Sequence, residues 1–541
     1  RRRPYEKKDD MFKVNPDVES SGLGCGQRLE PTGGGELFTP KCWIVVVPRG
    51  SAAEENVGSP YEQDASRYGV MTSPLSDHAW SNRIAISLDF NPVDSVCDLG
   101  LKERRIVGTE LIAPAVGSWQ PALCGASGRP PYSFASVSDA SARQQILTPT
   151  VGSPGMAVVS SPVASSEVDP TSPAVYAPLS LSGMVIGFNI ERSPLSSASQ
   201  ASQDLSGVRV ADINLTPRLV AKLLSQSYRQ QVEIASEESP YEWVRTNPTN
   251  LAADPDFLQF NPEFETLQIA YGRSLSGLIA PGGNSDAARQ VWEWILADPE
   301  AKHWLDGEPD PFGMVVNPVY ATQSSANSSG VAFGDPAPVS FPKGDPYCLT
   351  LPKQGSIVAP PLCATDWMPF SQSLRDGARM TRAADDRARV GQNPFAVTAD
   401  QFWGRGGAQV LGRRATVSIT DSVSAAKYGI QTARLSRSGD NGSRRTFVAA
   451  DTAGLLEGVA GMTPQTDPLV LEPDPLADVP DGYPLTTLTY GMVRPLSLDA
   501  EAREHYAAFI EYAATDGQTV GLEPGELPRG YASLPQVLRL Q

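Results

Sequence analysis

The residues with the clearest chemical potential lie where a glycine turn precedes a helix. In APGGNSDAARQVWEWI (residues 280–295), two glycines come before Ser285 and Asp286, and helical spacing follows. The first amides of a helix have no partner within it and together carry about half a positive charge, so this turn can bind an anion. Serine and aspartate are also common helix caps, and the pattern alone leaves both roles open.

The rest of the sequence contains few motifs that are typical of catalysis or metal binding. The three histidines, His78, His303 and His505, form neither a triad nor a metal-ligand spacing. The glycine runs GGGELF and GGNSD lack the lysine of a nucleotide phosphate loop, and no G-x-S-x-G elbow precedes a histidine. We therefore predict a protein that is not an enzyme and that uses no cofactor or metal.

Composition limits the classes of partner. The 541 residues carry a formal net charge of −17, which disfavours nucleic acid and anionic membrane surfaces. No stretch approaches the roughly 20 apolar residues of a membrane helix, so we expect no direct membrane insertion. The 48 prolines and 47 glycines indicate long loops around two or three domains. Because residue 1 is arginine, we expect a mature chain or a piece of a longer one.

Six cysteines predict disulfides in an oxidising, extracytoplasmic setting. None has the C-x-x-C spacing of a zinc or redox site. They form three neighbouring pairs: Cys25 and Cys42, Cys97 and Cys124, and Cys348 and Cys363. Pairing within these neighbours is our first interpretation, and buried free thiols are the alternative.

The pattern of predicted secondary structure changes near residue 104. Residues 1–103 are β-rich, and in WSNRIAISLDF (80–90) apolar and polar residues alternate as in a half-buried strand. From 104 onward strands alternate with amphipathic helices, which predicts an α/β fold. The strongest segments are a buried strand at 182–190 and helices within 215–228, 285–305 and 499–518. The Pro/Gly/Ser-rich stretch at about 305–400 is expected to be a long insertion.

The order of these segments resembles the PstS-like phosphate-binding proteins of ABC transporters, a branch of the type 2 periplasmic-binding-protein fold. RIVGTELIAPAVGSW (105–119) is similar to the family's opening strand and helix, and YSFASVSDASARQQIL (132–147) to its second strand and helix-entry loop. GMAVVSSPVASSEVD (155–169) and YAPLSLSGMVIGFNI (176–190) resemble the third strand and the hinge strand. The resemblance covers residues 104–541 and implies two α/β lobes that close on a solute by hinge motion around two crossover strands.

The resemblance also implies where a ligand would bind. Carried over position by position, the site consists of Thr109, Glu110, Asp139, Ser141, Ser160, Ser161, Ser285, Asp286 and Arg289. Asp286 stands where the family has glycine, and serine stands where the family has an aspartate on the third strand. The family's arginine has no clean counterpart, so Arg273 or Arg289 is its substitute.

Two added carboxylates, Asp139 and Asp286, disfavour orthophosphate. A unit charge about 4 Å from an anion costs on the order of 4 kcal/mol at an effective dielectric near 20. We therefore predict an extracytoplasmic, secreted or cell-surface PstS-like solute-binding protein with a degenerate anion site, which binds a neutral or cationic solute between the lobes or has lost its ligand. The alternative is a cell-surface structural or interaction protein that uses this fold as a scaffold for a cell-envelope partner.

Overall fold

The computed structural model describes residues 41–47, 80–88, 97, 102–124, 129–150, 152–232, 242–269, 275–324, 336–343, 348–349, 360–363, 369–393, 395–464 and 470–540. The chain divides into two compact units. One comprises residues 1–103, 118–131 and 521–526, and the other comprises residues 104–117, 132–520 and 527–541.

The first unit contains a two-stranded antiparallel ribbon. Strands β1 (Cys42–Val46) and β2 (Ile84–Leu88) pair with Cys42 opposite Leu88. Strand β2 lies where the sequence predicts a strand, but the predicted burial is wrong: Ile84 and Ile86 are 53% and 41% exposed. Period-two alternation shows that two faces differ, and it does not supply a layer to cover the apolar face.

The disulfide prediction is confirmed for Cys97 and Cys124, which are bonded to each other. Cys42 and Cys348 are also disulfide-bonded. Cys25 and the side chain of Cys363 lie outside the described residues, so the pairing expected for them stays a prediction. No described cysteine is a free thiol.

The second unit is built on a seven-stranded mixed sheet with the order β12-β6-β18-β5-β3-β4, in which β13 also pairs with β6. Its strands are β3 (Arg104–Gly108), β4 (Tyr132–Ser136), β5 (Met156–Val159), β6 (Val175–Ile190), β12 (Ala415–Asp421), β13 (Gln431–Thr432) and β18 (Thr486–Val493). Strand β3 is parallel to β4 and β5, whereas β18 runs antiparallel to both β5 and β6.

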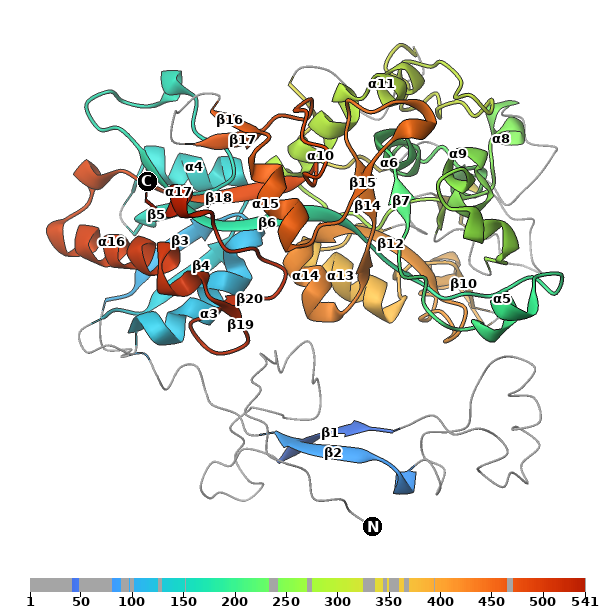
Figure 1. Ribbon diagram of the computed structural model, residues 1–541, viewed down its shortest axis with the longest axis horizontal. Coiled ribbons are helices and arrows are strands. Elements are labelled where there is room, and N and C mark those ends of the chain that lie inside the picture. Colours follow the sequence, from blue (N-terminus) through green and yellow to red (C-terminus); the bar gives the residue numbers. More distant parts are fainter. Residues whose placement is uncertain are drawn as a thin grey trace. The chain divides into compact units, whose positions relative to one another are not determined.

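Strand β6 belongs to two lobes. Its first half, Val175–Gly183, pairs with β18, and its second half, Met184–Ile190, pairs with β12. Figure 1 shows β6 running between the part of the unit that holds β3, β4 and β5 and the part that holds β12. We call these parts the first and the second lobe. The predicted two-lobed α/β fold is thus confirmed, and β6 is a strand that crosses between the lobes.

Helices cover both lobes, and their boundaries follow local signals. The principal ones are α4 (Asp139–Leu147) and α16 (Ala500–Ala514) in the first lobe, and α6 (Pro217–Leu224), α10 (Asp286–Ala297), α11 (Pro299–Leu305), α13 (Leu374–Ala383) and α14 (Ser422–Tyr428) in the second. The side chains of Thr216, Ser285 and Asp499 cap α6, α10 and α16 by accepting an amide hydrogen. Pro217 at the first position of α6 needs no amide partner.

The described residues form further helices and strands. They are α3 (Ala113–Cys124), α5 (Gln200–Asp204), β7 (Asn214–Leu215), α7 (Arg229–Val232), α8 (Glu242–Thr246), α9 (Pro255–Leu258), β8 (Cys348–Leu349), β9 (Leu362–Cys363), β10 (Gly391–Gln392), β11 (Trp403–Gly404), β14 (Arg434–Ser436), β15 (Phe447–Val448), α15 (Thr452–Val459), β16 (Met462–Pro464), β17 (Leu471–Pro473), β19 (Val520–Gly521), β20 (Leu527–Pro528) and α17 (Gln536–Arg539). No helix among the described residues is both long enough and apolar enough to cross a membrane.

The core of the second lobe fixes α10. Trp292, Trp294 and Trp304 are at most 1% exposed, and their indole N–H groups donate to the carbonyl oxygens of Ser340, Ser436 and Met314. These tryptophans are therefore core residues, as their helical spacing favours. Helix α13 lies inside the stretch that the sequence predicts to be an insertion with few periodic segments, and it packs against β12.

Candidate functional site

The start of α10 has the geometry that its sequence predicts. Gly283 has φ of +93°, a backbone conformation that side-chain-bearing residues rarely adopt. Ser285 caps the helix, because its Oγ accepts the amide hydrogen of Ala288 at 3.1 Å. The serine therefore serves the helix itself. Its own amide donates to the carbonyl oxygen of Val339 at 2.8 Å, and the next amide, the first of α10, is that of Asp286.

A carboxylate from the first lobe binds that amide. Asp139, the first residue of α4, accepts the N–H of Asp286 through Oδ2 at 3.1 Å, and Asp139 is only 2% exposed. Burial raises the pKa of the Asp139 carboxyl to about 6, and the nearby charge of Asp286 adds to the rise. The chain thus places its own carboxylate where a helix start would hold an anion.

Arg143 supplies the cation of this arrangement. It lies one helical turn after Asp139 on α4, and its Nη1 and Nη2 contact the two carboxylate oxygens of Asp286 at 2.5 and 3.3 Å. Nη1 also donates to the carbonyl oxygen of Ser161 at 3.4 Å. The sequence interpretation missed this residue. The i, i+4 spacing of Asp139 and Arg143 was the signal that could have found it.

Of the two arginines that the sequence suggests, Arg289 and Arg273, the structure describes only Arg289. Arg289 donates through Nη2 to Ser161 Oγ at 2.5 Å and through Nη1 to Glu293 at 3.0 Å. Its Nη2 also lies 4.0 Å from the carboxylate of Glu472. Arg273 lies outside the described residues. The charge of Arg289 is therefore already shared among groups of this chain.

A small cavity remains beside α10. It has a volume of about 20 Å³ and is lined by Ser160, Ser161, Asp286, Arg289, Gln290, Glu293, Glu472, Pro473, Thr487 and Leu488. A site needs on the order of 10–15 Å³ by this measure to hold one water molecule. Orthophosphate is several times larger than a water molecule, so the closed arrangement has no room for it.

Glu110 makes a second contact of the same kind. It begins the short helix after β3, and its Oε1 accepts the N–H of Leu374 at 2.8 Å, at the start of α13. Burial raises the pKa of the Glu110 carboxyl to about 7, and the charge of Asp421 contributes to the rise. Two carboxylates of the first lobe thus occupy two helix starts of the second. We call the Asp139–Asp286 and Glu110–Leu374 contacts the interlobe clamp.

Two expected site residues lie apart from the clamp. Thr109 is 5% exposed, and its N–H bonds the carbonyl oxygen of Val158 at 3.0 Å. Ser141 is exposed, and its N–H bonds the Oγ of Ser138, the cap of α4. The structure therefore gives both residues a local backbone role. It brings Glu110, Asp139, Ser160, Ser161, Asp286 and Arg289 to the interface of the lobes, whereas Ser285 bonds within its own lobe.

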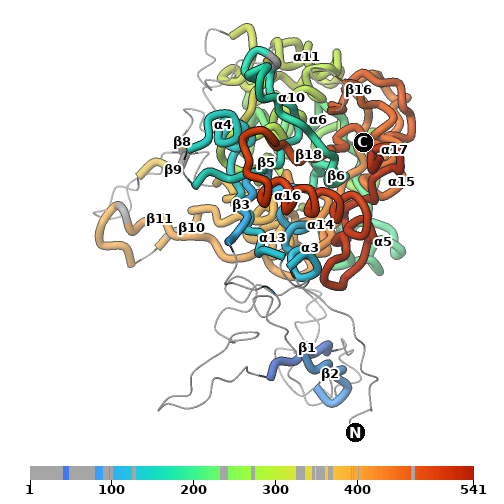
Figure 2. Tube along the Cα trace, turned by 90° about the vertical axis from the view of Figure 1, so that its left-hand side faces the viewer, coloured from blue at the N-terminus to red at the C-terminus, as the bar shows by residue number. Residues whose placement is uncertain are grey.

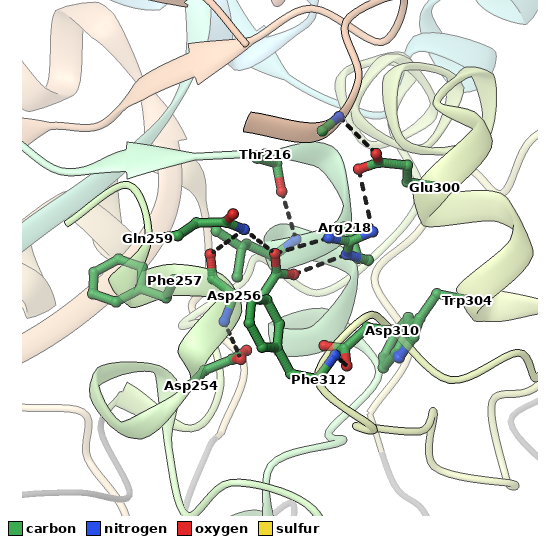
Figure 3. Close-up of polar contacts among 12 residues, drawn as sticks. Thr216, Arg218, Asp254, Asp256, Phe257, Gln259, Glu300, Trp304, Asp310 and Phe312 are labelled. Atoms are coloured by element: carbon green, nitrogen blue, oxygen red, sulfur yellow. Dashed lines mark hydrogen bonds and ion pairs between the residues drawn. The ribbon is translucent and has the colours of Figure 1, made fainter. Parts of the chain in front are cut away.

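A second charged cluster lies inside the second lobe. The Nζ of Lys222, on α6, lies 2.9, 2.9 and 2.6 Å from the carboxylates of Asp254, Asp256 and Asp310, and all four side chains are fully buried. Burial lowers the pKa of Lys222, but the three carboxylates outweigh this effect and raise it. Arg218 makes a bidentate pair with Asp256 at 2.8 Å, as Figure 3 shows.

This second cluster has a structural role. Its charges face one another inside the lobe, where solvent does not reach Lys222 or the three aspartates. An ammonium that is held charged by three carboxylates has no free electron pair, so it cannot act as a nucleophile or a base. Among the described residues no group of histidine, cysteine and carboxylate side chains is arranged to hold a metal ion.

Comparisons with known proteins give distant matches in fold. No protein-family model matches the chain, and no curated protein sequence matches it. A high affinity periplasmic phosphate-binding protein (PfluDING) bound with phosphate is similar at 11% identity and a TM-score of 0.40, over 81% of this chain and 92% of that one. A human phosphate binding apolipoprotein gives the same four values. A phosphate binding protein from Stenotrophomonas maltophilia is 12% identical with a TM-score of 0.38, over 81% and 92%.

Proposed function

We propose that this chain is an extracytoplasmic, non-enzymatic protein built on a solute-binding-protein fold whose anion site is filled by its own carboxylates, and that it acts as a cell-surface interaction protein. The observation that carries the proposal is the Asp139 carboxylate on the first amide of α10. In a receptor for an anion, that donor would be free for the solute.

The charges around the start of α10 oppose the displacement of Asp139 by an anionic solute. Asp139, Asp286, Glu293 and Glu472 lie around Arg143 and Arg289, so carboxylates outnumber guanidinium groups in this region. A phosphate would have to displace Asp139 and then remain near it. One uncompensated charge about 4 Å away costs on the order of 4 kcal/mol at an effective dielectric near 20.

The hydroxyl groups of the cavity do not point to catalysis. Ser161 Oγ accepts a hydrogen bond from Arg289, and a guanidinium does not take up a proton at ordinary pH. A serine nucleophile needs a base as its neighbour. Arg289 cannot supply that base, which supports the non-enzymatic part of the proposal.

A solute receptor is the second candidate function. The observation in its favour is the polar lining of the cavity, where Ser160, Thr487 and Glu472 lie together. Such groups suit a neutral or cationic solute better than an anion. Binding would require the lobes to separate about β6 and the clamp to release, because the closed cavity holds on the order of one water molecule.

Thermal unfolding of the purified chain separates the two functions. A ligand present at about 1,000 times its Kd adds about 4 kcal/mol to the free energy of unfolding. We expect no rise in Tm with phosphate, sugars, amino acids or divalent cations, and we expect capture of a cell-envelope protein. A clear rise with a neutral or cationic compound would favour the receptor. A rise with phosphate, together with its saturable binding in calorimetry, would overturn the proposal.

A further inference from the structure

The β10–β11 hairpin of the second unit presents an apolar tip. Phe395 and Val397, in the loop between the two strands, are 87% and 78% exposed. Phe395 is the most exposed large apolar side chain in the described part of the chain. Figure 2 shows β10 and β11 standing out from the rest of their unit. Two such side chains on one projecting loop form a contact surface.

The tip is held in a fixed shape by its own polar groups. The side-chain oxygen of Asn393 accepts the N–H of Phe395 at 3.0 Å, and that of Gln401 accepts the N–H of Val397 at 3.2 Å. The carbonyl oxygen of Asn393 accepts the N–H of Ala396 at 3.2 Å. Three consecutive backbone donors are therefore satisfied within the loop, which removes a main cost of moving the tip out of water.

The base of the hairpin is anchored in the fold. Phe402 and Trp403, at the base, are buried in one cluster with Ile279 and Met380, and Ala396, between the two exposed tip residues, belongs to the same cluster. The indole N–H of Trp403 donates to the carbonyl oxygen of Pro360 at 2.7 Å. Phe395 and Val397 thus project from a rigid support, so their exposure does not come from a loose chain end.

Basic residues surround the hairpin in an otherwise acidic chain. From residue 382 to 414 the sequence contains six arginines and three aspartates, whereas the whole chain has a net charge of −17. Arg389 lies two residues before β10, and Arg405 directly follows β11. Both side chains are exposed, and the Arg405 guanidinium also forms an ion pair with Asp385. Charges farther away than about 8 Å are largely screened at physiological ionic strength, so the local arginines decide which surface the hairpin meets.

We propose that Phe395 and Val397 insert into the interface of an anionic lipid bilayer, with Arg389 and Arg405 at the level of the lipid phosphates. Apolar side chains with flanking arginines are the chemistry of interfacial membrane binding. A projecting tip whose backbone N–H groups are hydrogen-bonded within the loop can enter a lipid phase without leaving donors unpaired. A protein partner would have to offer a matching pocket. The proposal does not depend on whether a solute binds between the lobes.

Vesicle binding by the full chain tests the proposal. Co-sedimentation is measured with vesicles of phosphatidylglycerol and phosphatidylcholine in equal amounts and with vesicles of phosphatidylcholine alone. We expect binding to the anionic vesicles, and a loss on the order of a hundredfold in partition coefficient for the Phe395→Ser, Val397→Ser double variant. The matched control is Val537→Ser, Leu540→Ser, which removes two side chains that are 69% and 80% exposed near the C-terminus.

The charge requirement is tested by Arg389→Gln with Arg405→Gln, which should abolish the preference for anionic vesicles while Phe395 and Val397 remain. Unchanged Tm values show that the variants are folded. The proposal is overturned if the full chain does not bind anionic vesicles, or if the tip variant binds them as well as the control does. Tip-dependent capture of a protein without vesicle binding would also overturn it.

Discussion

Replacing Asp139 by asparagine isolates the electrostatics of the clamp. The asparagine side-chain oxygen can still accept the N–H of Asp286, but it carries no charge at any pH. In the native chain, burial and the charge of Asp286 raise the pKa of Asp139 from 3.8 to about 6. The folded state therefore binds this proton more tightly than the unfolded state does.

The direction of the pH effect follows from that difference. The stabilising contribution is complete below the unfolded pKa of 3.8 and is lost as the pH rises through the folded pKa of about 6. At 1.36 kcal/mol for each pH unit, the loss amounts to about 3 kcal/mol at pH 8. The Asp139→Asn variant does not undergo it, so we expect the variant to match the native chain near pH 4 and to exceed its stability by up to about 3 kcal/mol near pH 8.

Urea unfolding followed by tryptophan fluorescence from about pH 4 to pH 8 measures this difference. Asp499→Asn is the matched control, since Asp499 is an exposed cap of α16 and its replacement changes the same atoms. We expect no comparable rise for the control. A difference between Asp139→Asn and the native chain that stays constant with pH, or that grows on acidification, would refute the proposed burial of a charged Asp139 at the start of α10.

Three further substitutions test neighbouring parts of the structure by the same unfolding measurement. Arg143→Met leaves two carboxylates without their cation and should destabilise the fold by about 3 kcal/mol, and adding Asp286→Asn should recover part of the loss. Lys222→Met should cost about 3–5 kcal/mol or prevent folding, because three buried carboxylates lose their shared ammonium; an effect below 1 kcal/mol would contradict this. Gly108→Ala should destabilise strongly, since a Cβ there would lie 2.1 Å from the carbonyl oxygen of Val158 and φ is +151°; a variant with unchanged Tm would show that the end of β3 is placed wrongly.

Local signals in the sequence were sufficient for α10. The glycine turn, the cap at Ser285 and the spacing of buried tryptophans are all properties of one short segment, and the helix begins at Asp286 as they predict. The hinge strand was likewise recognisable at 182–190 from its apolar run, although β6 begins earlier, at Val175. Features of this kind need no knowledge of distant residues.

The partners of α10 were not accessible in the same way. Asp286 could be identified as an added charge, but Arg143 is 143 positions away in the chain, and only the fold brings the two together. The start of α13 at Leu374 was hidden because the buried face of that helix includes Gly377, Ala378 and Thr381, which are small or polar and give little apolar signal in the sequence. Without α13, Glu110 had no visible partner, and the sequence placed it only among candidate ligands.

A crystal structure determined in the presence of phosphate tests the filled anion site most directly. We expect the Asp139 carboxylate to remain in hydrogen-bond contact with the amide of Asp286, with Arg143 paired to the Asp286 carboxylate and no ion between the lobes. A phosphate enclosed there, bound to the amide of Asp286 and to Arg143 with Asp139 displaced, would contradict the proposed self-filled site.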